Sequence, residues 1–145
     1  MAARSSMASE VFLDTAYAIA LSAPGDLFHR RALELADQLS ASRTSLITTR
    51  AILLEIGNSL SRQRYRRAAI KLLDSLEVDP SVEIVPFSEE LYSRAIQLFR
   101  ERLDKEWGLT DCISFVVMQE RRITGALTTD EHFLQAGFRA LMREE

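Results

Sequence analysis

Short apolar runs alternate along the chain with longer segments in which apolar residues recur every three or four positions. Short runs that end at polar or turn-forming residues are typical of buried strands. They predict four strands, at residues 11–13, 45–49, 82–87 and 123–127.

The longer segments have helical spacing, because residues three and four apart share one face of a helix. They predict helices at 16–21, 28–39, 52–60, 65–76, 89–103 and 111–118. Ser88 is a predicted N-cap, and Glu89 and Glu90 follow it as acids in the first turn. Residues 113–118 are apolar almost all round, so we expect their helix to be buried on most faces.

Strands separated by helix-sized segments imply right-handed crossover connections and parallel pairing. We therefore predict a three-layer α/β/α sandwich around a central, mainly parallel sheet of four to five strands. Ligands of such open sheets gather just beyond the carboxyl ends of the strands. Acidic residues at strand ends are accordingly the first candidates for chemistry.

Four acids are expected near that edge of the sheet. Asp14 directly follows the first predicted strand, and Asp130 holds the equivalent place after the last one. Glu55 lies within an apolar helical stretch, and Asp111 opens the most apolar helix. All four should therefore lie near the buried middle of the fold.

Each acid also has an ordinary structural interpretation. Asp14, Asp111 and Asp130 could be helix N-caps, and Glu55 could reach solvent from the flank of its helix. Taken together, the pattern favours a site, because no basic residue is spaced to pair locally with Asp14 or Asp111. Converging carboxylates repel unless a cation neutralises them, and oxygen ligands favour Mg²⁺, with Mn²⁺ as a substitute.

Composition fits one compact domain at residues 9–145, with residues 1–8 as a flexible tail. The single cysteine excludes an internal disulfide and favours a cytoplasmic location, and no apolar run is long enough to span a membrane. The sequence contains no P-loop, no G-x-G-x-x-G motif and no Ser-His-Asp arrangement. Phosphodiester hydrolysis is the reaction that a carboxylate-bound divalent ion suits.

The net charge of −3 argues against binding nucleic acid through bulk positive charge, but one segment is strongly basic. This segment, residues 61–73, contains no acid and five basic residues: Arg62, Arg64, Arg66, Arg67 and Lys71. This basic cluster could contact RNA phosphates, could be a solvated helix face, or could dock acidic segments of a protein partner.

His132 follows Asp130 by two residues and admits two interpretations. It could approach a phosphate, although a surface histidine at a helix end is the commoner case.

Several segments resemble the PIN domain ribonucleases, and among them the VapC toxins of prokaryotic toxin-antitoxin pairs. The resemblance runs over about residues 11–138. It is carried by Val-Phe-Leu-Asp-Thr at 11–15, Leu-Glu at 54–55, the stretch 104–115 and Leu-Thr-Thr-Asp-Glu-His-Phe at 127–133. The last two, in this order and at this separation, are the specific part of the pattern.

The resemblance implies an acidic metal site made of Asp14, Glu55, Asp111 and Asp130. Asp14 and Asp111 would be the principal Mg²⁺ ligands, while Glu55 and Asp130 would complete the site or hold a second ion. Some relatives carry a further acid one helical turn past the third, where this chain has Ser114. A full second metal site is therefore an open question.

The resemblance also implies endonucleolytic RNA cleavage, a VapB-like antitoxin as partner and a homodimer. Three functions follow as hypotheses: a toxin endoribonuclease, an RNA-processing nuclease without an antitoxin, and a non-catalytic PIN-fold binding module.

Overall fold

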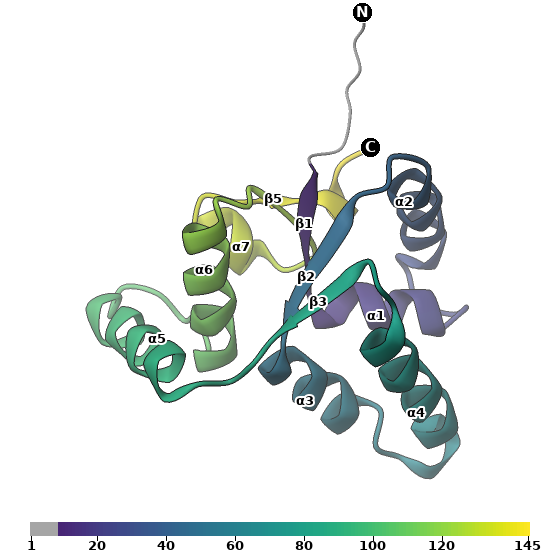
Figure 1. The fold of residues 1–145 in the computed structure, drawn as a ribbon, viewed down its shortest axis with the longest axis horizontal. Coiled ribbons are helices and arrows are strands. Elements are labelled where there is room, and N and C mark those ends of the chain that lie inside the picture. Colours follow the sequence, from purple (N-terminus) through teal and green to yellow (C-terminus); the bar gives the residue numbers. More distant parts are fainter. Residues whose placement is uncertain (1–8) are drawn as a thin grey trace, which may run out of the picture.

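The computed structural model describes residues 9–145, and the predicted tail at 1–8 lies outside the described residues. Five strands form one sheet in the order β3-β2-β1-β4-β5 (Figure 1). All four pairings between neighbouring strands are parallel. The strands are β1 (Glu10–Leu13), β2 (Ser45–Thr49), β3 (Val82–Val85), β4 (Gly125–Leu127) and β5 (Arg139–Ala140).

Helices cover both faces of this sheet, which confirms the predicted three-layer fold. Those of one group contact one another: α1 (Thr15–Ser22), α2 (His29–Ala41), α3 (Arg50–Ser59) and α4 (Gln63–Val78). The other group is α5 (Glu89–Glu101), α6 (Leu109–Arg121) and α7 (Glu131–Gln135). A short 3₁₀ turn, Leu141–Arg143, follows β5. The contact of α3 with both α1 and α6 brings the two layers together at one end of the sheet.

The core lies where the central strands meet α6. Strands β1 and β4 are buried along nearly their whole length, and α6 buries every residue from Cys112 to Met118. That continuous burial confirms the helix predicted to be buried on most faces. Ser88 caps α5 as predicted, because its side chain accepts a hydrogen bond from the Leu91 amide at 3.1 Å.

The structure corrects several predicted boundaries. Strand β3 ends at Val85, one residue before Pro86, which has no amide to donate to a neighbouring strand. The last predicted strand begins at Gly125 rather than at 123, because Arg122 has φ 55° and ends α6 in the left-handed conformation. The sequence patterns did not predict the short α7 and β5.

Within residues 9–145, no helix combines the length and the apolar character that crossing a membrane requires.

Candidate metal centre at the carboxyl edge of the sheet

Asp14 lies where the two central strands end side by side. Leu13 of β1 pairs with Leu127 of β4, so Asp14 and Thr128 leave the sheet as neighbours. The Thr128 hydroxyl donates a hydrogen bond to Asp14 Oδ2 at 2.7 Å. Asp14 occupies the N-cap position of α1, but its side chain makes no capping hydrogen bond. The carboxylate is therefore held toward the site rather than used to begin the helix.

Burial decides the electrostatics of Asp14, which is only 8% exposed. Desolvation raises the pKa of its carboxyl from 3.8 to about 7, although hydrogen bonds from Thr128 and the Thr15 backbone lower it. The charges of Glu55 and Asp111 raise this pKa further. Asp14 thus interacts electrostatically with the acids on α3 and α6, so the start of α1 lies close to both helices.

Glu55 lies in the middle of α3 and is half-buried. Its Oε1 accepts a hydrogen bond from the Thr15 hydroxyl at the start of α1. This contact ties the side chain to the residue that follows Asp14, while Glu55 remains partly exposed to solvent.

Asp111 lies in the first turn of α6, three residues after the N-cap residue Gly108. Its Oδ2 accepts a hydrogen bond from the Gly108 amide at 3.0 Å and lies 3.0 Å from His132 Nδ1. Burial raises the pKa of this carboxyl, and the neighbouring Asp130 raises it too. Asp111 therefore contributes to capping and also stands in the cluster.

Asp130 is the N-cap of α7, and its Oδ1 accepts the His132 amide at 2.9 Å. The Asp130 amide in turn donates to Thr128 Oγ1 at 3.0 Å. The capping interpretation and the site interpretation of Asp130 are compatible, because the cap places its carboxylate beside Asp111.

The acids fall into two neighbouring groups. One ligand atom each from Asp111, Asp130 and His132 lie within 4.8 Å of one another, while Asp14 and Glu55 are not members of that group. Coulombic coupling of Asp14 with Glu55 and with Asp111 joins the groups. The structure thus brings all four predicted residues to one edge of the sheet, and their metal-binding role remains a prediction.

Local pattern analysis missed the contact of His132 with Asp111. His132 does lie at a helix end, at the start of α7, but it is half-buried and its Nδ1 lies 3.0 Å from Asp111 Oδ2. The two residues are 21 positions apart, on different helices. The only available signal was the short spacing from Asp130.

The donor set fits a divalent cation. Among residues 9–145, no arginine or lysine forms an ion pair with any of the four acids, and only His132 lies at salt-bridge distance from two of them. Buried carboxylates without a basic partner favour either protonation or a bound cation. Carboxylate oxygens suit hard ions such as Mg²⁺ and Mn²⁺.

The predicted basic cluster occupies the N-cap and the first turns of α4. Its five side chains are exposed. Arg66 donates to the Ser61 carbonyl at 3.1 and 2.8 Å, and the Arg64 guanidinium lies 4.8 Å from the centre of the Tyr65 ring. Helix α4 packs against α3, which carries Glu55.

The fold and the acidic edge together define a PIN-like α/β protein, and the family comparison agrees. The chain belongs to the PIN domain family, whose match covers residues 11–139. It is 28% identical over 129 residues to the 23S rRNA-specific endonuclease VapC20 of Mycobacterium tuberculosis, covering 88% of this chain and 95% of that protein. The predicted resemblance to VapC proteins is therefore confirmed.

Two solved structures show the same fold. The crystal structure of M. tuberculosis VapC20, described as a Sarcin-Ricin loop cleaving toxin, matches with a TM-score of 0.78 at 27% identity. That match covers 90% of this chain and 97% of the other. VapBC2 from Rickettsia felis, bound to a promoter DNA fragment, matches with a TM-score of 0.64 at 16% identity, covering 90% and 96%. At that identity the second match supports the fold alone.

Proposed function

We propose that this protein is a Mg²⁺-dependent endoribonuclease that acts as the toxin of a toxin-antitoxin pair, with Mn²⁺ as a possible substitute. The observation that carries the proposal is the convergence of four acids around a buried, unpaired Asp14 at the carboxyl edge of a PIN fold. The similarity to VapC20, which is named as an endonuclease and a toxin, supports it.

In this proposal, Asp14 and Asp111 are the principal metal ligands, and Glu55 and Asp130 complete the site. A divalent cation, when bound, supplies the Lewis acidity that phosphodiester hydrolysis requires. The protein's own contribution is orientation. Thr128 fixes one oxygen of Asp14 by a hydrogen bond of 2.7 Å, and Thr15 directs Glu55 toward the same side.

The test is cleavage of a broad set of structured RNAs by the purified protein with Mg²⁺ or Mn²⁺. We expect activity that EDTA abolishes and that Asp14→Asn and Asp111→Asn reduce by at least about 100-fold, the scale of losing one electrostatic catalytic contact. Asp37→Asn is the matched control, because Asp37 is an exposed acid on α2. Activity that survives EDTA, or no cleavage of any RNA by the wild type, would contradict the proposal.

The toxin role concerns the cell rather than the chemistry. We expect expression to arrest growth, the Asp111→Asn variant to be harmless, and a co-expressed VapB-like antitoxin to restore growth. Arrest that persists with Asp111→Asn would contradict the mechanism. RNA cleavage without arrest would favour the RNA-processing nuclease, and metal binding without cleavage would favour the non-catalytic binding module. The cytoplasm is the proposed location, since the RNA targets and an antitoxin would be there.

For the RNA itself, we propose that the basic cluster on α4 contacts phosphates. Its five exposed bases stand beside the helix that carries Glu55, and Tyr65 offers an aromatic face in the same segment. Such contacts give attraction that depends on salt but not on sequence.

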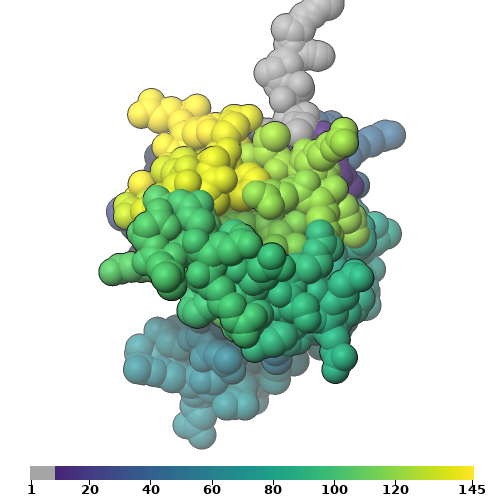
Figure 2. All heavy atoms as spheres, turned by 90° about the vertical axis from the view of Figure 1, so that its left-hand side faces the viewer, coloured from purple at the N-terminus to yellow at the C-terminus, as the bar shows by residue number. Residues whose placement is uncertain are grey.

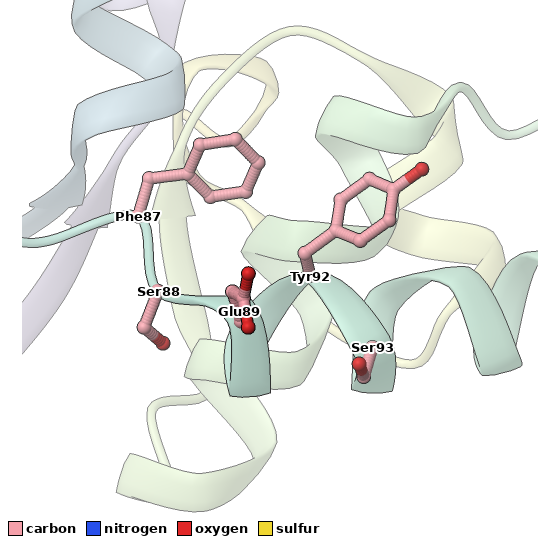
Figure 3. A pocket seen from close by; sticks show the side chains of 5 residues that line it. All are labelled: Phe87, Ser88, Glu89, Tyr92 and Ser93. Carbon is pink, nitrogen blue, oxygen red and sulfur yellow. The ribbon is translucent and has the colours of Figure 1, made fainter.

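For the homodimer, we propose an apolar surface made by Leu54, Phe87 and Tyr92, which are 60%, 47% and 43% exposed. Figure 2 shows α5 in green at the front of the molecule. Figure 3 shows the Phe87 and Tyr92 rings beside a hollow of about 460 Å³. Phe87 also lines a second hollow of about 320 Å³, together with Leu54 and Glu55.

A second copy on this surface would bury three large apolar side chains and would lie next to the acidic site, because Glu55 shares the second hollow. Sedimentation velocity tests this arrangement. Leu54→Glu and Tyr92→Glu should yield monomers, while Leu27→Glu should not, since Leu27 is 89% exposed and lies outside the surface. A wild-type monomer at all accessible concentrations would contradict the proposed dimer.

A further inference from the structure

We propose that His132 is a metal ligand through Nδ1, together with Asp111 and Asp130, and that this nitrogen raises the affinity of the centre for Mn²⁺ more than its affinity for Mg²⁺. The inference rests on the proposed metal-dependent function and deepens it. It concerns the group of ligand atoms on α6 and α7 rather than the pair formed by Asp14 and Glu55.

The distances fit a shared ion. His132 Nδ1 lies 3.0 Å from Asp111 Oδ2 and 3.4 Å from Asp130 Oδ1. Adjacent ligands of an octahedral ion with bonds of about 2.1 Å are about 3.0 Å apart, so the three atoms already have the spacing of neighbouring ligands. A single hydrogen bond from Nδ1 would account for one of these two contacts, whereas one ion accounts for both.

The fold holds the imidazole in this place. The His132 amide donates to Asp130 Oδ1 at 2.9 Å, so the first turn of α7 ties the histidine to the acid before it. The neighbouring Phe133 is fully buried and anchors the same turn. Trp107, in the loop before α6, donates its indole N–H to Gln135 Oε1 at 3.0 Å. These contacts fix α7 against the start of α6, where Asp111 lies.

The position of His132 also offers a ligand for a second ion, although α6 has Ser114 where some relatives carry a further acid. Ser114 stands one helical turn after Thr110, is fully buried, and donates its hydroxyl to the Thr110 carbonyl at 3.2 Å. Its oxygen is thereby turned to the helix backbone. His132 approaches Asp111 from α7 instead, and supplies a third protein ligand beside Asp111 and Asp130.

The chemistry of the ligand sets the metal preference. Carboxylate oxygens cannot donate, so without an ion the Nδ1 proton must point at Asp111 or Asp130. To bind an ion through Nδ1, the ring must present the lone pair of that nitrogen and carry a proton on Nε2 instead. Mg²⁺ strongly favours oxygen ligands, whereas imidazole nitrogen is a common ligand of divalent transition ions.

The experiment is binding of Mn²⁺ to the full-length protein without RNA, followed by electron paramagnetic resonance. Pulsed measurements should detect ¹⁴N coupling from a directly bound imidazole in the wild type. His132→Asn should lose this coupling, and its Mn²⁺ affinity should fall about 10- to 100-fold, the range seen when metal surroundings are altered. The Mg²⁺ affinity of this variant should fall less, so the ratio of its Mn²⁺ affinity to its Mg²⁺ affinity should be lower than in the wild type.

The matched control is His29→Asn, which removes the only other histidine, a residue on α2 whose Nδ1 contacts the Ala20 carbonyl. This variant should keep both the coupling and the affinity. Mn²⁺ bound to the wild type without ¹⁴N coupling would overturn the inference while leaving the proposed metal centre intact. No Mn²⁺ binding at all would overturn the metal centre and this inference together.

Discussion

Replacing Asp14 by Asn should stabilise the metal-free protein at alkaline pH, although Asp14 is a proposed metal ligand. Burial raises the pKa of this carboxyl from 3.8 to about 7, so the folded state binds a proton more tightly than the unfolded state. The stability that this proton contributes is fully present below about pH 3.8 and is lost as pH rises through about 7. Asn is neutral at every pH and can still accept the Thr128 hydrogen bond.

The size of this stability change follows from the rise in the Asp14 pKa from 3.8 to about 7. At about 1.4 kcal/mol for each pKa unit, it is about 4 kcal/mol between the pKa of the unfolded state and that of the folded state. Between pH 5 and pH 8 the wild type should lose about 2.5 kcal/mol of its free energy of unfolding through Asp14. The rest of the 4 kcal/mol is lost between about pH 3.8 and pH 5. Solvent screens this charge little, because Asp14 is only 8% exposed.

The assay is urea unfolding of the wild type and Asp14→Asn at pH 5, 6.5 and 8 with EDTA present. The difference between the two free energies of unfolding isolates Asp14 from acids such as Glu83, whose pKa is lowered by Arg121. This difference should change by about 2.5 kcal/mol in favour of the variant from pH 5 to pH 8. If the difference in free energy of unfolding does not change with pH, the reasoning that the buried Asp14 charge destabilises the fold is refuted. Mn²⁺ added in place of EDTA at pH 8 should stabilise the wild type more than the variant, which lacks one proposed ligand.

Three further predictions test other parts of the structure. Thr128→Val removes the hydrogen bond that lowers the Asp14 pKa, and should reduce the free energy of unfolding at pH 8 by about 1–3 kcal/mol in urea, with a smaller loss at pH 5. Ser88→Ala removes the cap of α5 and should cost about 1 kcal/mol in the same assay at either pH. Reversing Arg64 and Arg67 to Glu should weaken RNA binding and flatten its salt dependence in filter-binding titrations; unchanged RNA affinity with loss of antitoxin binding would favour partner docking.

The sequence by itself determined the layers of the fold. The apolar run of β2 and the helical spacing of α2 and α4 predicted their elements closely, because the strand is buried at consecutive residues and each helix buries one face. Prediction weakened where elements are short. The two-residue β5 and the five-residue α7 carry no periodicity of their own, and they form because the preceding sheet and helices offer a place to pack.

The sequence also pointed to the four acids, because Asp14 and Asp130 follow predicted strands and the other two lie in apolar helical stretches. What only the tertiary structure decided is how those acids meet. The 2.7 Å bond from Thr128 to Asp14 joins residues 114 positions apart, and the His132–Asp111 contact joins two helices. Such contacts depend on strand register and on the angle at which helices pack, which no local pattern encodes. Burial, which sets the pKa of Asp14, likewise exists only once the two helical layers close over the sheet.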